Sequence, residues 1–240
     1  MSSRFKRHAL VRLTTAGWEQ AIAGVAPELH SVVQDWRQHD WPAVVRRRDA
    51  DASEDELCLG IALPPDADGN KLRIALRVAQ VHVREMRAPL TLHEVMTQAP
   101  SQWRAALEKL QHEALVQALD MRVYGSLALQ ALTGMNYLRP DSDIDLLFSP
   151  LDEPQLVAGI QLLARTAHTL PLDGEVQFPD GAVAWKEWQQ VTAAAGAGRV
   201  LLKRTQDVAL LLAADVVAAF SQGASLATAQ AMPELPVCPL

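Results

Sequence analysis

Positive charge is in short supply in this sequence. Its 240 residues include 22 Lys and Arg against 28 Asp and Glu, which gives a formal net charge of −6. A protein that wraps a nucleic-acid duplex needs many cationic contacts to phosphates, and this sequence has no basic tail that could supply them. We therefore expect no nucleic acid among its partners, and a small phosphorylated substrate or a protein partner instead.

Long apolar runs and paired cysteines are also lacking. The longest apolar segment, Val208 to Phe220, contains Asp215 and is too short to span a bilayer. The basic stretch Met1 to Arg12 is not followed by the apolar core of a signal peptide. Of two cysteines, Cys58 lies in an apolar run and Cys238 near the end, which favours free thiols over a disulfide. We expect a cytoplasmic protein with no membrane partner.

Several catalytic signatures are missing as well. Neither a Walker-type phosphate loop nor a Gly-x-Ser-x-Gly nucleophile elbow occurs. Gly196-Ala197-Gly198 lacks the third glycine of a dinucleotide-binding fingerprint. His93-Glu94 and His112-Glu113 are not followed by a second histidine at the metalloprotease spacing. These absences argue against P-loop enzymes, serine hydrolases of the elbow type, dinucleotide-dependent enzymes and zinc proteases.

The composition is that of an ordinary globular protein, with 49% apolar and 21% charged residues, and the length allows one large domain or two small ones. We predict a smaller α+β N-terminal domain at 1–95, a catalytic domain at 96–222 and a flexible, proline-containing tail at 223–240. In the N-terminal domain, apolar patterning predicts one helical segment, Trp18 to Trp36, broken near Pro27. The predicted strands are His8–Leu13, Pro42–Arg48, Leu57–Leu63 and Leu72–Val83.

The most informative stretch lies in the second domain. Val123-Tyr124 indicates the end of a strand, and Gly125-Ser126 a tight turn into an apolar helix from Leu127 to Leu132. Glycine allows a ligand to approach the backbone closely, and the unpaired amides at a helix start suit a phosphate. Ser126 is therefore better interpreted as a phosphate ligand than as a covalent nucleophile.

A second strand follows from Asp143 to Phe148. Side chains two apart on a strand point to one face, so Asp143 and Asp145 should project together. Two carboxylates held side by side repel each other, and a shared divalent cation, most simply Mg²⁺, relieves the repulsion. A lone Gly-Ser is usually only a turn and a lone Asp-x-Asp only a solvated strand edge. Their combination on neighbouring strands indicates a phosphate site beside a metal site.

This combination resembles the nucleotidyltransferase superfamily of polymerase β. The resemblance implies a polymerase β-like domain, a mixed sheet flanked by helices, and a third carboxylate on a nearby strand. Leu172–Phe178 offers Asp173 and Glu175, which share a face, and we prefer Asp173. Ala182–Trp185 and Val200–Lys203 are predicted as the last two strands, followed by a helix that Thr205 caps and that runs to about Phe220.

Two cationic positions complete the candidate site. Lys203, at the end of an apolar strand, could reach a phosphate as a point charge, although a solvent-facing lysine is an equal alternative. Arg46, in the run Arg46-Arg47-Arg48, could contact a phosphate or an acidic protein. The alternative is a solvated basic patch that balances the acidic loop Asp49 to Glu56.

The resemblance narrows to a family through the rest of the chain. Sixteen residues separate Ser126 from Asp143, a wider gap than in minimal nucleotidyltransferases. Together with this gap, several flanking segments resemble the malonate decarboxylase holo-acyl-carrier-protein synthases, also called phosphoribosyl-dephospho-coenzyme A transferases. These segments are Arg7 to Val11, Pro42 to Arg47, Phe178 to Ala182, Lys186 to Trp188 and Leu201 to Lys203.

The resemblance implies transfer of a prosthetic group. The donor would be 2′-(5″-triphosphoribosyl)-3′-dephospho-coenzyme A, and the acceptor a serine of the malonate decarboxylase acyl-carrier subunit, with release of pyrophosphate. Asp143 and Asp145 would hold Mg²⁺, and Asp173 or Glu175 would bind a metal or act as general base. Gly125 and Ser126 would hold the leaving pyrophosphate, with Lys203 neutralising it. The N-terminal domain would cover the donor or dock the carrier, with Arg46 to Arg48 as a landing patch.

Three alternatives remain open. One is an adenylyltransferase that uses ATP on a protein or small molecule, and another is the citrate lyase type of holo-carrier synthase. The third is a non-catalytic binding protein with a degenerate transferase fold. The number of metal ions and the oligomeric state are left open by the residues.

Overall fold

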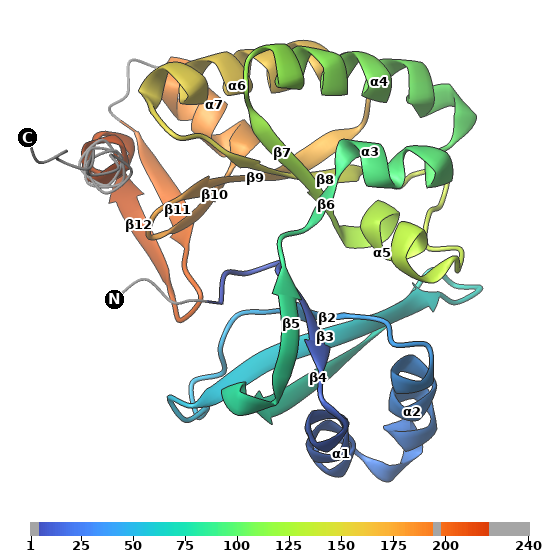
Figure 1. Ribbon diagram of the computed structural model, residues 1–240. Coiled ribbons are helices and arrows are strands. Elements are labelled where there is room, and N and C mark those ends of the chain that lie inside the picture. The colour runs from blue at the N-terminus through green and yellow to red at the C-terminus, as the bar shows by residue number, and fades with distance from the viewer. Residues whose placement is uncertain (1–4, 194–197, 221–240) are drawn as a thin grey trace, which may run out of the picture.

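The computed structural model describes residues 5–193 and 198–220, which form two sheets stacked one above the other in Figure 1. The first has five strands in the order β4-β3-β2-β1-β5, and the second has seven in the order β12-β11-β10-β9-β8-β7-β6. The predicted tail at 223–240, with Cys238, lies outside the described residues. Cys58 is a buried free thiol. No described helix combines the length and the apolar composition that crossing a membrane requires.

The five-stranded sheet is antiparallel throughout and carries two helices on one face (Figure 1). Trp18, Val33 and Trp36 from these helices belong to one buried core with Ile74 and Leu76 of the sheet. A 3-10 turn at Pro27–Leu29 separates the helices, so the predicted break near Pro27 is confirmed. The elements are β1 Leu10–Leu13, α1 Thr15–Ala23, α2 His30–Gln38, β2 Ala43–Val45, β3 Glu56–Pro65, β4 Lys71–Ala79 and β5 Val83–Arg87.

The strand predicted to run from Leu72 to Val83 is in fact two strands. β4 ends at Ala79, a 3-10 turn at Gln80–His82 redirects the chain, and β5 then pairs with β1 on the far edge of the sheet. Apolar residues alternate with polar ones on both sides of the turn, but the alternation shifts by one position, from Ile74, Leu76 and Val78 to Val81 and Val83. Only this shift marks the break, and the predicted strand runs across it.

The seven-stranded sheet is mixed, as predicted: β8 and β9 are parallel, and the other pairs are antiparallel. Its strands are β6 Leu90–Thr91, β7 Asp120–Tyr124, β8 Ile144–Ser149, β9 Leu172–Phe178, β10 Gly181–Ala184, β11 Arg199–Lys203 and β12 Val208–Leu212. Its helices are α3 Leu92–Val95, α4 Ser101–Val116, α5 Gly125–Thr133, α6 Glu153–Thr166 and α7 Trp185–Ala193, and residues 213–220 are also helical.

Helices α4, α6 and α7 cover one face of this sheet (Figure 1). Leu107, Leu163 and Trp188 from these helices belong to the same buried core as Phe148 of β8. A Cβ at Gly159 of α6 would lie 2.1 Å from the Phe148 ring, so glycine lets this helix approach the sheet. The helices leave the opposite face of β8 and β9 free for polar side chains.

The prediction of a helix that starts at Thr205 is wrong for the first half of that segment. Residues Val208–Leu212 form the edge strand β12, paired with β11 along its length, and helical structure begins only at 213. The strand alternates exposed and half-buried residues, but a short run of apolar residues is compatible with a strand or a helix on periodicity alone. Pairing with β11 decides between them. Val200–Lys203 is therefore not the last strand.

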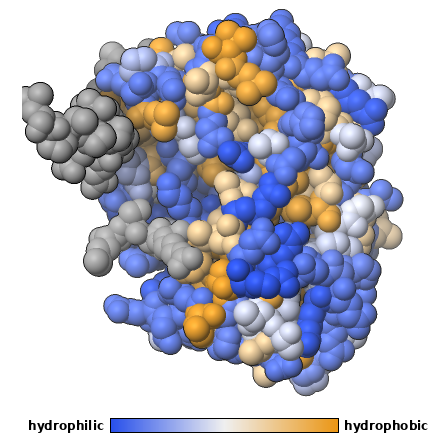
Figure 2. Space-filling model, viewed as in Figure 1, coloured by the Kyte–Doolittle hydropathy of each residue, from blue (hydrophilic) through white to orange (hydrophobic). Residues whose placement is uncertain are grey.

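The two halves are joined by side chains that cross between them. Leu10 of β1 belongs to the core of the seven-stranded sheet, whereas Leu129 of α5 packs on the core of the five-stranded sheet. The Tyr137 hydroxyl donates a hydrogen bond of 2.8 Å to the Ala62 carbonyl of β3. On the face drawn in Figure 2, hydrophobic residues show between hydrophilic ones along the boundary of the halves. The open face of β8 and β9 is thereby held opposite the five-stranded sheet.

Candidate active site

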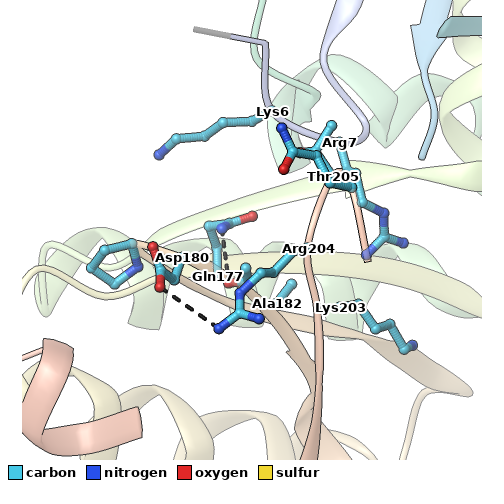
Figure 3. Close-up of a pocket in the computed structure, with 11 residues that line it drawn as sticks. Lys6, Arg7, Gln177, Asp180, Ala182, Lys203, Arg204 and Thr205 are labelled. Carbon is cyan, nitrogen blue, oxygen red and sulfur yellow. Dashed lines mark hydrogen bonds and ion pairs between the residues drawn. The ribbon is translucent and has the colours of Figure 1, made fainter. Parts of the chain in front are cut away.

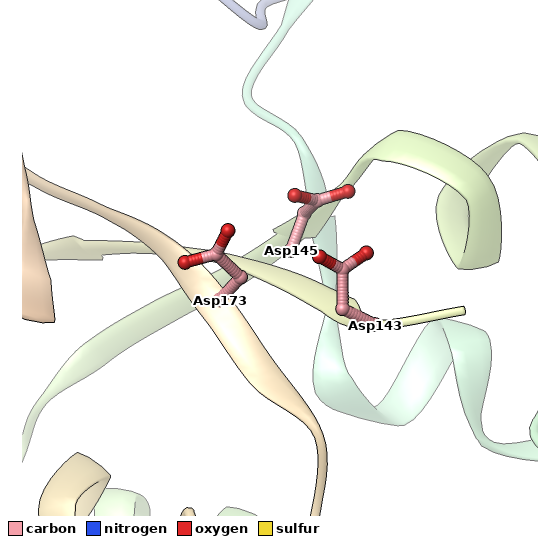
Figure 4. Close-up of side chains that lie close together, drawn as sticks. All are labelled: Asp143, Asp145 and Asp173. Carbon is pink, nitrogen blue, oxygen red and sulfur yellow. The ribbon is translucent and has the colours of Figure 1, made fainter. Parts of the chain in front are cut away.

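Three aspartates converge at the start of β8 and β9. Asp145 of β8 and Asp173 of β9 are register partners across the parallel pair, and Asp143 immediately precedes β8. One carboxylate oxygen from each lies within 4.8 Å of the others. Figure 4 shows the three side chains directed toward a common space. The expected Asp143–Asp145 juxtaposition is therefore present, and Asp173, not Glu175, lies with them.

The electrostatics of the trio favour a bound cation. Burial, followed by the charges of Asp143 and Asp173, raises the pKa of Asp145 to about 7, while Lys71 opposes the rise. Three carboxylates with one exposed member, Asp143, form an oxygen ligand set open to solvent. This is the set that Mg²⁺ prefers in proteins, so the residues present fit this ion.

Gly125 is required by the close approach of this trio to the start of α5. Its φ is +68°, and a Cβ there would lie 1.9 Å from Oδ2 of Asp145, a distance that no side chain can occupy. The N-cap residue Tyr124 gives no side-chain hydrogen bond to the first amides of the helix. These amides lie at the positive end of α5, next to the carboxylates, where a phosphate would be bound favourably.

Lys71 is a site residue that sequence reasoning missed. It begins β4 in the five-stranded sheet, yet its Nζ donates a hydrogen bond of 2.6 Å to Oγ of Ser126. Fifty-five positions separate the two residues in the chain, so no local pattern could have paired them. Lys71 brings a positive charge from the N-terminal half to the Gly125-Ser126 bend.

Glu175 is occupied by a different set of partners. It is 5% exposed and lies 2.9 Å from Lys203, 3.3 Å from Arg7 and 3.2 Å from the His8 ring. Burial alone would raise the pKa of Glu175, but the His8 hydrogen bond and the charges of Arg7 and Lys203 outweigh it and hold the pKa at about 2. Glu175 thus anchors the N-terminal segment to β9.

His8 packs beside the same carboxylate. Its ring stacks on Tyr124 with 3.9 Å between centroids. Burial lowers the pKa of His8, although Glu175 partly offsets this effect. His8 and Arg7 carried no chemical signal in the sequence beyond the family resemblance.

Arg46 is largely neutralised by its neighbours. Its Nη2 lies 2.6 Å from Asp49, and its Nε donates to the Leu59 carbonyl at 2.9 Å. Asp49 also forms an ion pair with Arg77, whose Nε lies 2.8 Å from Oδ2 of Asp49. Of the predicted basic run, Arg46 thus pairs with Asp49 of the acidic loop, although Arg46 still lines a cavity between the two sheets.

Two cavities adjoin these residues. The larger, about 760 Å³, extends between the sheets from Gly125 to Lys203 and Arg204. The smaller, about 170 Å³, lies where the β9–β10 turn meets the end of β11 (Figure 3). Figure 3 shows Arg204 directed toward Asp180, 3.9 Å away, and the Lys203 side chain pointing away from Asp180.

Comparison with known families matches both halves of the chain. Residues 6–89 match the model of the phosphoribosyl-dephospho-CoA transferase MdcG N-terminal domain. Residues 91–214 match that of the phosphoribosyl-dephospho-CoA transferase MdcG C-terminal domain.

Curated relatives extend this match. A protein named phosphoribosyl-dephospho-CoA transferase from Xanthomonas axonopodis pv. citri is 40% identical over 209 residues, which cover 85% of this chain and 93% of the relative. Proteins of the same name from Bradyrhizobium diazoefficiens and Pseudomonas aeruginosa are 37% and 30% identical. They cover 85% and 71% of this chain and 89% and 78% of their own lengths. The comparison with solved structures found no match.

Proposed function

The chain belongs to the phosphoribosyl-dephospho-CoA transferase family, and we propose that it loads the acyl-carrier subunit of malonate decarboxylase. The group transferred is 2′-(5″-phosphoribosyl)-3′-dephospho-CoA, taken from its triphosphate precursor and attached to a serine of the carrier. The observation that carries the proposal is the carboxylate trio beside the Gly125 bend.

The proposed reaction exchanges one phosphorus–oxygen bond for another. The serine oxygen of the carrier bonds to the α-phosphorus of the donor, the bond from that phosphorus to the bridging oxygen breaks, and pyrophosphate leaves. Asp143, Asp145 and Asp173 would hold Mg²⁺, which when bound would neutralise phosphate charge and polarise phosphoryl oxygens.

The remaining roles belong to side chains of this protein. The first amides of α5, with Ser126 and Lys71, would bind the phosphates that leave as pyrophosphate. The Asp173 carboxylate would accept the serine proton. Lys186 lies 3.6 Å from Asp173 and would orient it. We place the reaction in the cytoplasm, a compartment that suits the free thiol of Cys58.

Mass spectrometry of the carrier tests the proposal. Incubation of the full chain with apo-carrier, the triphosphate donor and Mg²⁺ should add the phosphoribosyl-dephospho-CoA mass to the carrier serine and release pyrophosphate. Asp143→Asn should slow this at least about a thousandfold, because the charges of this trio are worth several kcal/mol in the transition state.

The matched control is Asp141→Asn, which changes an exposed aspartate two residues away and should transfer at the normal rate. Near-normal turnover by Asp143→Asn would remove the trio from the mechanism. Label that enters the carrier from ATP, with no transfer from the triphosphate donor, would replace the proposal by an adenylyltransferase.

A further inference from the structure

The larger cavity has walls from both halves of the protein. Its lower wall is the face of β2, β3 and β4 that looks away from α1 and α2, and its upper wall includes β7, α5 and β11 (Figure 1). Tyr124 and Gly125 line it, and Gly125 lies against Asp145 of the aspartate trio. A ligand in this cavity can therefore be continuous with a phosphate held at the Gly125 bend.

Small residues create the hollow. Gly60 and Ala75 are register partners on β3 and β4, and Ala62 lies two residues further along β3 on the same face. Their neighbours Ile61 and Ile74 have side chains buried in the core on the other face. A Cβ at Gly60 would have its nearest contacts at 3.7 and 3.8 Å, which is ordinary packing. The backbone at residue 60 does not require glycine. The effect of glycine there is to leave the cavity open, because it has no side chain to fill it.

The charge of the lining is opposite to that of the whole protein. Six basic residues and no acidic residue of the described chain line the cavity, although the chain has a net charge of −6. Four of the six pair with carboxylates that lie behind the lining, at Glu175, Asp49, Asp180 and Asp207. Arg47 and Arg73 are exposed and form no ion pair with another described side chain. The six are Arg7, Arg46, Arg47, Arg73, Lys203 and Arg204.

Apolar side chains form the rest of the wall. Ala128, Leu129 and Leu132 of α5 line it beside Val44 and Leu10. A cavity of about 760 Å³ falls within the roughly 300–1,000 Å³ of small-molecule sites. An apolar wall with a basic, acid-free rim suits a long ligand that combines apolar parts with several phosphates.

We propose that this cavity binds the dephospho-CoA portion of the donor. The inference rests on the proposed function, which supplies the donor, and it places the part of the donor that does not react. The nucleoside and the pantetheine arm lie along the α5 wall above Gly60 and Ala75. The 5′-diphosphate lies at Arg73 and Arg47. The five-stranded sheet is thus half of the donor site.

The test measures binding of 3′-dephospho-CoA, without its triphosphoribosyl group, to the full chain by titration calorimetry. Ala75→Leu places extra bulk in the cavity and should weaken binding at least about tenfold, a loss of about 1.4 kcal/mol. Ala23→Leu is the matched control, because it makes the same change at an exposed position of α1, and it should leave binding unchanged. Thermal unfolding checks that both variants are folded.

Arg73→Gln is a second test of the same cavity, which removes a positive charge at an exposed strand position. It should weaken dephospho-CoA binding roughly tenfold, the effect of losing one charge-assisted hydrogen bond, and should reduce the salt dependence of binding. Arg165→Gln, on the helix-covered side of the other sheet, should change neither quantity. Inorganic pyrophosphate with Mg²⁺ should bind all four variants as it binds the unchanged protein.

Two outcomes overturn the inference: dephospho-CoA does not bind the unchanged protein, or Ala75→Leu and Arg73→Gln both bind it as tightly as the unchanged protein does. Either can occur while the carrier is still loaded, so the inference can fail alone. Conversely, Asp145→Asn should lose transfer and keep dephospho-CoA binding. Binding at the cavity without any loading of the carrier would reject the proposed function and leave the cavity assignment in place.

Discussion

Replacing Asp145 by asparagine should stabilise the fold while it abolishes transfer. In the absence of divalent cations, the Asp145 carboxylate is partly buried between Asp143 and Asp173, and its pKa rises from an ordinary 3.8 to about 7. The folded chain therefore binds this proton more tightly than the unfolded chain. Stability should fall as the pH rises from about 4 to about 7 and stay low above that range.

The magnitude follows from the pKa. A rise from 3.8 to about 7 corresponds to about 4 kcal/mol at 1.36 kcal/mol for each tenfold change in proton affinity. Burial is the largest cause of this pKa shift, and an asparagine at the same position also loses hydration. We therefore expect Asp145→Asn to recover about half of the 4 kcal/mol, which raises the free energy of unfolding by about 2 kcal/mol. For a protein of this size that raises the Tm by about 4–8 °C.

Thermal unfolding in a chelating buffer at pH 5 and pH 8 measures the effect. Asp145→Asn should melt above the unchanged protein at pH 8 and close to it at pH 5. Adding Mg²⁺ should raise the Tm of the unchanged protein and narrow the gap. A variant less stable than the unchanged protein at pH 8 in chelator would show that the three carboxylates do not repel one another as described.

Three further outcomes are expected. Gly125→Ala should lower the transfer rate about a hundredfold, measured by pyrophosphate release, because its Cβ would displace the Asp145 carboxylate. Lys71→Met should raise the KM for the triphosphate donor roughly tenfold, since one charge-assisted hydrogen bond is lost; an unchanged KM would place Lys71 outside the donor site. Glu175→Gln should lower the free energy of unfolding at pH 7 by about 2–4 kcal/mol, because it breaks a buried ion pair. The stability that Glu175 supplies should disappear as the pH falls from about 5 to about 2. The Tm of Glu175→Gln should therefore fall less over this pH range than the Tm of the unchanged protein.

The parts of the site that the sequence predicted are those encoded locally. Gly125 and Ser126 follow directly after β7, and Asp143 and Asp145 lie at the start of the adjacent strand β8. The period of a strand is enough to place both aspartates on one face. The choice between Asp173 and Glu175 could not be made in this way, because both occupy the same face of β9. Register with β8 decides it, since Asp173 is the partner of Asp145.

Residues that reach the site from afar could not be predicted. Lys71 depends on how the two sheets face each other, and Arg7 on the path of the N-terminal segment to Glu175. Neither is visible in hydrophobic periodicity. The β12 strand was missed for a related reason, because its pairing with β11, and not its own composition, determines its conformation.

The anchoring of Arg7 and His8 on Glu175 bears on how this protein can be divided. A separately produced half starting near residue 91 would expose Leu10-facing core and leave the Glu175 carboxylate buried without Arg7. A hybrid made from the N-terminal half of one relative and the catalytic half of another should therefore work only under one of two conditions. Either the N-terminal segment with Arg7 and His8 comes from the same relative as the catalytic half, or these two residues are the same in both relatives. Lineages of this protein should inherit both halves as one indivisible gene.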